Sequence, residues 1–222
     1  MHLAERQDFP NCHTKTCDVG IFVQHLLIDT GGGKGNGASV LELCPNVEDL
    51  ALWIGKNNKS HLPIIQHLPL RSFSADLSNW SANDLLVPAF SKLTHLDVID
   101  FSEGEMWNIV NSLPKLTHLS FNCIVELAVL QRLLSQCPLL SLFIFDLSRE
   151  ARSTQSQEYH TINDSRLVLI NSYRRNLIVK DWKESAYGRY GFWEFSERFS
   201  EARRREFLSK RVKTVDSTNT GP

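Results

Sequence analysis

Histidine recurs at the matched position of two similar segments, LTHLDV at 93–98 and LTHLSF at 116–121, and the first segment also has an aspartate two residues later. These segments contribute His95, Asp97 and His118, and imidazole with carboxylate is a side-chain set that binds zinc or performs acid–base catalysis. Such chemistry also needs a pocket that excludes water, which an open sheet surface does not supply. The sequence contains no G-x-S-x-G or H-E-x-x-H motif. We therefore predict a non-enzymatic protein without catalytic residues, with a metal-dependent enzyme as the second alternative.

The five cysteines form no pattern that predicts disulfides or a metal site. Cys12 and Cys17 flank His13, but a closed zinc site takes four ligands. Cys44 and Cys137 each precede a proline in the same slot of the repeat described below, where a small buried thiol packs well. An odd count without a regular framework is typical of reduced thiols. We predict that the protein binds no metal.

A glycine-rich segment, GGGKGNG at 31–37, lies between a predicted strand and a predicted helix. Phosphate-binding loops have this order and the motif G-x-x-x-x-G-K-[ST]. If Lys34 were the motif lysine, position 28 would be glycine and position 35 serine or threonine. The chain has Ile28 and Gly35 instead, so the hydroxyl that would bind magnesium is missing. We predict a flexible crossing loop and no cofactor.

Composition excludes several classes of partner. The chain has 222 residues, 42% of them hydrophobic, and a net charge of -1. This charge provides no general attraction to nucleic acid or to an anionic membrane. No apolar run approaches the ~20 residues that span a bilayer, and the first residues lack the apolar stretch of a signal peptide. We predict a soluble intracellular protein, in the cytoplasm or nucleus, that binds neither nucleic acid nor membrane.

The two histidine segments belong to a longer repeat with a period of 23 residues. Its first apolar position recurs as Val47, Leu70, Leu93, Leu116 and Leu139. Its fourth position recurs as Leu50, Phe73, Leu96, Leu119 and Leu142. A fixed period in the twenties with the pattern L-x-x-L-x-L is the signature of a leucine-rich-repeat solenoid. We predict an α/β solenoid, a short horseshoe with parallel strands on the concave face and helices on the convex face.

The predicted domain organisation follows from where the repeat holds. Residues 1–20 are an irregular lead-in, 21–207 are the solenoid with a C-terminal capping helix, and 208–222 are a disordered tail. The polar stretch 146–165 is long enough to be an insertion loop. Near the end of the solenoid, Phe192, Phe195, Phe199 and Ala202 recur at helical spacing, and such a helix could cover the open end of the last repeat.

Alternation along the strands decides which side chains are available to a partner. Positions 1, 4 and 6 of the repeat point into the core, whereas positions 3, 5 and 7 line the concave face. Aromatic side chains that flank a polar groove suit a protein or peptide partner, because such side chains dominate binding energy. The predicted partner-binding residues are Trp53, His95, Asp97, His118, Ser120, Phe143 and Phe145. Two simpler interpretations stay open: the histidines are merely solvated, and the loop at 146–165 covers the two phenylalanines.

Three stretches carry a resemblance to a known family: HLLIDTGGG (His25–Gly33), LCPNVEDLALW (Leu43–Trp53) and LPKLTHLSF (Leu113–Phe121). They resemble the repeat region of F-box and leucine-rich-repeat proteins of mushroom-forming fungi. The closing segment, with Asp181-Trp182, Gly191-Phe192-Trp193, Phe199 and Arg203-Arg204, is similar as well.

This resemblance implies a further function. In that family an N-terminal helical F-box binds the adaptor of a cullin-type ubiquitin ligase, and the repeats hold the substrate. No such helical segment precedes Val23 in this sequence. The resemblance therefore implies, as the alternative function, the substrate-recognition part of a ubiquitin-ligase receptor. It would bind the adaptor only if an F-box exists upstream.

Overall fold

A computed structural model describes residues 19–29, 37–101, 106–146, 158–170, 175–189 and 191–218 of the chain. The chain divides into two compact units, residues 1–116 and 117–222. Each unit combines parallel strands with helices, so the predicted α/β class is confirmed. The lead-in with Cys12 and Cys17, the loop with Lys34 and most of the stretch 146–165 lie outside the described residues.

Within the described residues of the first unit, four parallel strands, each beside the next in sequence, form a sheet. They are β1 (His25–Asp29), β2 (Asp49–Trp53), β3 (Ser72–Leu77) and β4 (His95–Phe101). The predicted row at the third position of the repeat is confirmed in this unit, because His25 pairs with Asp49, Asp49 with Ser72, and Ser72 with His95. After Ala75 the register between β3 and β4 shifts by one residue, so Asp76 pairs with Asp100 and not with Ile99, as an unbroken period would predict. Before this shift, the 23-residue period of β2–β4 fixes which side chains share a face.

The apolar positions of the repeat form the core of the first unit. Leu50, Phe73 and Leu96 are each at most 1% exposed, as are their sixth-position neighbours along each strand. The ring of Phe73 also contacts Trp80 at 5.7 Å and Phe90 at 5.3 Å between centroids. Full burial of one such side chain contributes about 1.5–3 kcal/mol. Because each strand supplies one layer, the core continues from strand to strand.

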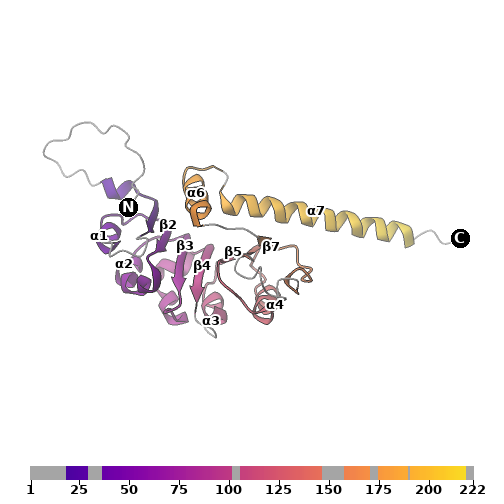
Figure 1. Ribbon diagram of the computed structural model, residues 1–222, viewed down its shortest axis with the longest axis horizontal. Helices are drawn as coiled ribbons and strands as arrows, with labels where there is room; N and C mark the ends of the chain where they lie inside the picture. The colour runs from indigo at the N-terminus through magenta and orange to yellow at the C-terminus, as the bar shows by residue number, and fades with distance from the viewer. Residues whose placement is uncertain are drawn as a thin grey trace. The chain divides into compact units, whose positions relative to one another are not determined.

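Short helices connect the strands of the first unit, and several are single 3₁₀ segments. They are η1 (Val19–Phe22), α1 (Gly37–Glu42), η2 (Gly55–His61), α2 (Leu62–Ile65), η3 (Ala82–Leu86), η4 (Pro88–Lys92) and α3 (Met106–Asn111). The segment NDLLVPAF, residues 83–90, lies in two 3₁₀ turns, because Val87 before Pro88 is extended and separates them. Figure 1 shows α1 and α2 together on one side of the strands.

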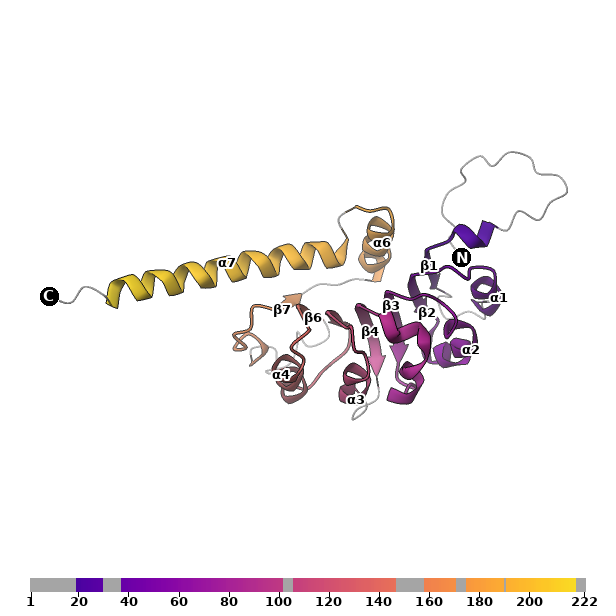
Figure 2. The ribbon, with the colours of Figure 1, turned by 180° about the vertical axis from the view of Figure 1, so that it is seen from behind.

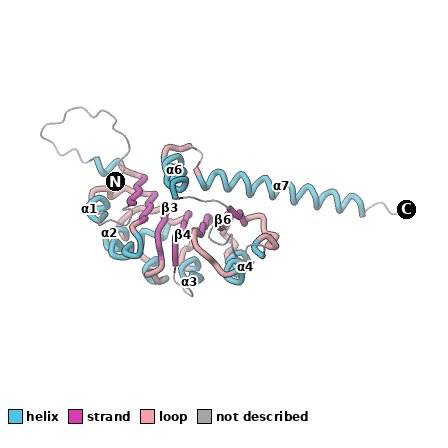
Figure 3. The backbone as a smooth tube through the Cα atoms, in the orientation of Figure 1, coloured by secondary structure: helices cyan, strands magenta, loops and turns pink. Residues whose placement is uncertain are grey.

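The described residues of the second unit form three parallel strands and three longer helices, and Figure 3 distinguishes its helices from its strands by colour. They are β5 (His118–Phe121), α4 (Leu127–Gln136), β6 (Leu142–Asp146), β7 (Leu167–Ile170), α6 (Arg175–Ala186) and α7 (Phe192–Thr218). Figures 1 and 2 show α4 and α7 on opposite sides of these strands. No helix among the described residues is long and apolar enough to cross a membrane.

The repeat slips by one residue between β5 and β6. His118 pairs with Leu142 rather than with Ser141, and Leu119 pairs with Phe143. The first apolar position is therefore Leu140, which is 2% exposed, and not Leu139, which is 62% exposed. One extra residue in this connection shifts every following side chain to the other face of the sheet.

Arg166 connects β7 to the C-terminal end of α4. Its guanidinium donates hydrogen bonds to the carbonyl oxygens of Leu134, Cys137 and Leu140. It also donates to Asp164 Oδ2 at 2.6 Å. The last carbonyl groups of a helix have no partner within the helix, so a cation at this end satisfies them and favours the helix dipole.

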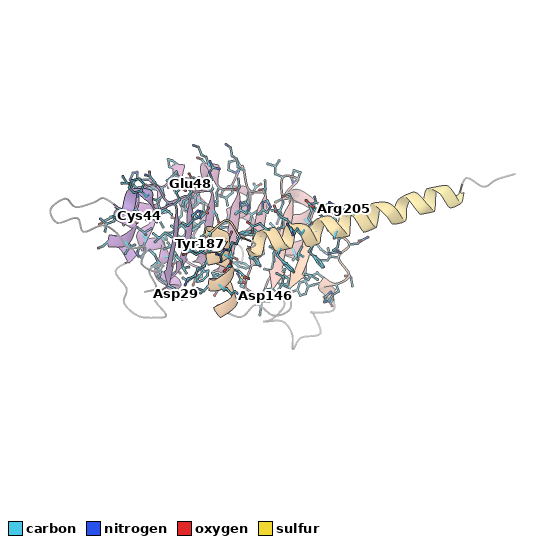
Figure 4. The ribbon with its side chains drawn as sticks, turned by 90° about the horizontal axis from the view of Figure 1, so that it is seen from above. Asp29, Cys44, Glu48, Asp146, Tyr187 and Arg205 are labelled. Atoms are coloured by element: carbon cyan, nitrogen blue, oxygen red, sulfur yellow. The ribbon has the colours of Figure 1, made fainter. Side chains whose placement is uncertain are left out.

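The face of α7 that packs on the strands differs from the predicted one. Phe195 and Phe199 are 65% and 47% exposed, so their predicted role in a buried stripe is wrong. Ser196 and Ser200 are buried instead, one turn apart, and Phe192 and Trp193 pack on the apolar cluster of β6 and β7. Figure 4 shows α7 lying across the strands of the second unit and continuing past them beyond Arg205.

The helix therefore covers a sheet face and not the open end of the last repeat. The predicted boundary at 208 also falls inside α7, whose backbone is helical to Thr218.

Candidate interaction surface

One face of β1–β4 carries the polar residues of the repeat, and we call it the polar face. It consists of alternate residues of the four strands, including His25, Asp49, Trp53, Ser74, His95 and Asp97. These side chains are half-buried or exposed, except for Ser74, which is 6% exposed. The predicted residues Trp53, His95 and Asp97 thus lie on one face of one unit.

A chain of hydrogen bonds fixes the middle of the polar face. The indole N–H of Trp53 donates to Ser74 Oγ at 2.9 Å, and the Ser74 hydroxyl donates to Asp97 Oδ2 at 2.7 Å. Each residue comes from a different strand, so the pairing of the strands sets the geometry. A half-buried indole with a satisfied N–H, beside an oriented carboxylate, is a rigid aromatic anchor of the kind that dominates protein interfaces. The predicted partner-binding residues include the tryptophan and the aspartate but not the serine that joins them.

An ion pair marks the first two strands of the polar face. His25 Nδ1 lies 2.5 Å from Asp49 Oδ2, and both side chains are about one-third exposed. The hydrogen bond to Asp49 raises the pKa of His25 above 6.5, while burial opposes the shift and the charges of Asp49 and Glu48 support it. At the other end of the same row, His95 Nδ1 lies 2.8 Å from Thr94 Oγ1. At slightly acidic pH, the His25 imidazole on β1 therefore carries a positive charge.

The His25–Asp49 pair should make stability depend on pH. Because the folded-state pKa of His25 is raised, its stabilising contribution is complete below pH 6.5 and is lost as the pH rises through the folded-state pKa. For a pair this exposed we expect a contribution below about 1 kcal/mol. Urea denaturation at mildly acidic and mildly alkaline pH should show that His25→Gln destabilises the protein only at the acidic value.

His67→Gln is the control, since His67 is exposed and forms no ion pair within the described part of the chain. An effect of His25→Gln that is equal at both pH values would contradict the assignment.

The strands of the polar face carry negative charge. They contain no lysine or arginine, and their carboxylates are Asp29, Asp49, Asp76, Asp97 and Asp100. Two of these carboxylates accept hydrogen bonds from backbone N–H groups close in sequence. Asp76 Oδ1 accepts from the Ser78 N–H at 2.9 Å, and Asp100 Oδ1 accepts from the Phe101 N–H. The remaining charge favours a partner with basic side chains.

The second unit places two of the predicted residues under α7. His118 Nε2 lies 2.8 Å from Glu197 Oε1, and the Trp193 ring meets the imidazole edge-on at 5.8 Å. The His118 side chain is 12% exposed. Ser120 is 1% exposed. Neither residue lies on an open surface, and the contact with Glu197 does not follow from the repeat pattern, because the two residues are 79 positions apart in the chain.

The predicted position of Phe143 and Phe145 on the concave face is wrong. Both are fully buried, because the register slip turns them into the core beside Leu119 and Phe121. Phe143 packs edge-on against Phe121 at 5.4 Å, and Phe145 packs against Tyr159 at 4.9 Å. These two side chains are therefore core residues and not aromatic anchors for a partner.

The described residues contain no group of three or more histidine, cysteine, aspartate or glutamate side chains that could hold a metal ion. In the same part of the chain, Cys44, Cys123 and Cys137 form no disulfide. Burial raises the pKa of the Cys44 thiol. Comparison of the chain with protein-family models, with curated proteins and with solved structures finds no match.

Proposed function

We propose that the protein is a non-enzymatic interaction module whose polar face binds a segment of a protein partner. The observation that carries this proposal is the hydrogen-bonded chain of Trp53, Ser74 and Asp97. It presents an aromatic surface and a carboxylate in fixed positions. These side chains would therefore lose little conformational entropy when a partner binds. Because the strands carry aspartates and no lysine or arginine, the partner segment is expected to be basic.

The same proposal includes the architecture and the location. The third-position residues of β2–β4 pair at a spacing of 23 residues, and this supports the proposal of a leucine-rich-repeat solenoid, in which a sheet face is the usual binding surface. The free thiols of the described cysteines support a reducing compartment, the cytoplasm or nucleus.

Replacing Trp53 with alanine should abolish most of the binding while the fold persists. A central interface tryptophan contributes about 2 kcal/mol or more, which is roughly thirtyfold in affinity. Proteins cross-linked to the wild-type chain in lysate would be identified by mass spectrometry, and the affinity of each purified candidate would then be measured for both variants. The binding should also weaken with salt if the partner segment is basic.

The matched control is Leu86→Ala, which truncates a large apolar side chain that is 65% exposed on η3 of the same unit. Circular dichroism would establish that both variants are folded. If folded Trp53→Ala binds the same partners with the affinity of Leu86→Ala, the polar face is not the binding surface.

A further inference from the structure

The strands of the second unit expose an apolar patch to α7. The patch consists of Leu142, Ile144, Val168 and Ile170, and α7 covers it with Phe192 and Trp193. Leu142, Ile144 and Val168 are each at most 2% exposed beneath the helix. Alternate residues of β6 and β7 thus form an apolar surface, and the first turn of α7 covers it.

Polar contacts around the patch set the position of α7. The Ser200 hydroxyl donates to the Ser165 carbonyl at 2.7 Å, Arg203 donates to the Leu167 carbonyl at 2.7 Å and Arg204 donates to the Ser141 carbonyl at 2.6 Å. The acceptors are backbone groups, and the donors are side chains of the helix. Together with the contact between His118 and Glu197, they define how a helix must be placed to bind here.

The fit between α7 and the strands is incomplete. Ser196 and Ser120 are buried, and neither hydroxyl has a hydrogen-bond partner in the described part of the chain. A buried hydroxyl without a partner disfavours the packed state. Two of the helix's aromatic residues, Phe195 and Phe199, also stay exposed on its other side. A helix with better-matched side chains could therefore pack more favourably on the same patch.

We propose that the patch is a binding surface for a helix with an aromatic pair at its start, and that α7 is its exchangeable resident occupant. The external ligand would be a helix of a partner protein with an adjacent aromatic pair that matches Phe192 and Trp193. It would also carry a carboxylate four residues after the second aromatic, as Glu197 follows Trp193. This surface lies in the second unit and is independent of the polar face.

Mass action determines how such an exchange would be detected. A tethered helix acts at an effective concentration on the order of millimolar, so the intact chain should bind an added helix weakly. Weakening the contacts of α7 lowers this competition and leaves the patch unchanged. A variant of α7 should therefore bind an external helix more tightly than the wild-type chain does.

The probe is a fluorescent peptide with the sequence of residues 191–205, and its binding to the full-length protein would be followed by anisotropy. Trp193→Ala removes the edge-on contact with His118 and part of the cover of the patch. We expect this variant to bind the peptide about tenfold or more tightly than the wild type, because the competing helix is weakened. Phe199→Ala, on the exposed side of the same helix, should bind like the wild type.

A second variant keeps the test decisive if Trp193→Ala does not fold. Glu197→Ala truncates a side chain that is 47% exposed and removes only its contact with His118, so about threefold tighter binding is expected. If the folded α7 variants bind the peptide no more tightly than Phe199→Ala, the proposal is overturned. Trp53→Ala should leave peptide binding unchanged, so failure here is separate from failure of the polar-face proposal.

Discussion

Phe143→Ala is expected to lower the free energy of unfolding by about 3–5 kcal/mol, the range for a buried phenylalanine replaced by alanine. Phe143 is fully buried and packs edge-on against Phe121, so its removal leaves a cavity between two strands. Urea denaturation followed by circular dichroism would measure the loss. A change of this size is a large part of the stability of an ordinary domain.

Leu139→Ala is the matched control for this prediction. Leu139 is 62% exposed, and an exposed substitution changes stability by about 0.5 kcal/mol or less. An unbroken 23-residue period would reverse the two results, because it places Leu139 in the core and Phe143 on the surface. A large effect of Leu139→Ala with a small effect of Phe143→Ala would therefore refute the register slip.

Arg166→Ala should destabilise the second unit by about 2–4 kcal/mol, since it leaves helix-end carbonyls and a half-buried carboxylate without their partner. Burial raises the pKa of Asp164, but the hydrogen bonds and charge of Arg166 lower it by more, so the pKa of this carboxyl lies below its usual value of 3.8. This carboxylate therefore stabilises the fold above pH 3.8, and its contribution is lost as the pH falls through the folded-state pKa. Urea denaturation of both proteins near neutral pH and near pH 3 would measure the difference.

Arg166→Lys separates charge from geometry. Lysine keeps the positive charge but cannot donate to three carbonyl groups and a carboxylate from one planar group, so an intermediate loss is expected. If Arg166→Ala unfolds at the same urea concentration as the wild type, the guanidinium does not hold the end of α4. A loss that does not shrink in acid would contradict the pairing with Asp164.

The sequence predicts the first unit well for a physical reason. Strands β2–β4 start at residues 23 apart, and polar side chains alternate with apolar ones in them, as in Asp49-Leu50 and His95-Leu96. One buried face fixes the register, because a slip of one residue would bury the aspartates and expose the leucines. The shared face of Trp53, His95 and Asp97 follows from this alternation.

The second unit lacks this constraint. The segment Leu139–Phe145 is apolar at nearly every position, so both registers bury leucine or phenylalanine. A strand that is covered on both faces shows no alternation, and every residue of β6 is buried. The cover on the second face is α7, whose contacts with β6 and β7 are distant in sequence. The slip could therefore not be inferred without the structure.

Helical spacing alone also misassigned the packed side of α7. The stripe of Phe192, Phe195 and Phe199 is the more hydrophobic one, but Ser196 and Ser200 are the buried residues. Small side chains let a helix backbone approach a sheet closely, and this allows the arginines of the next turn to reach backbone carbonyls. The hydrophobic pattern of the sequence does not predict these hydrogen bonds.

The short connections of the first unit have a kinetic consequence. Each strand pairs with a strand that starts 23 or 24 residues away, as His25 with Asp49 and Ser72 with His95. Closing such small loops costs little entropy, and each closure is nearly equal to the next. We expect this unit to fold rapidly by adding one strand at a time to a nucleus of two neighbours. A defect in one strand should then weaken its immediate neighbours most.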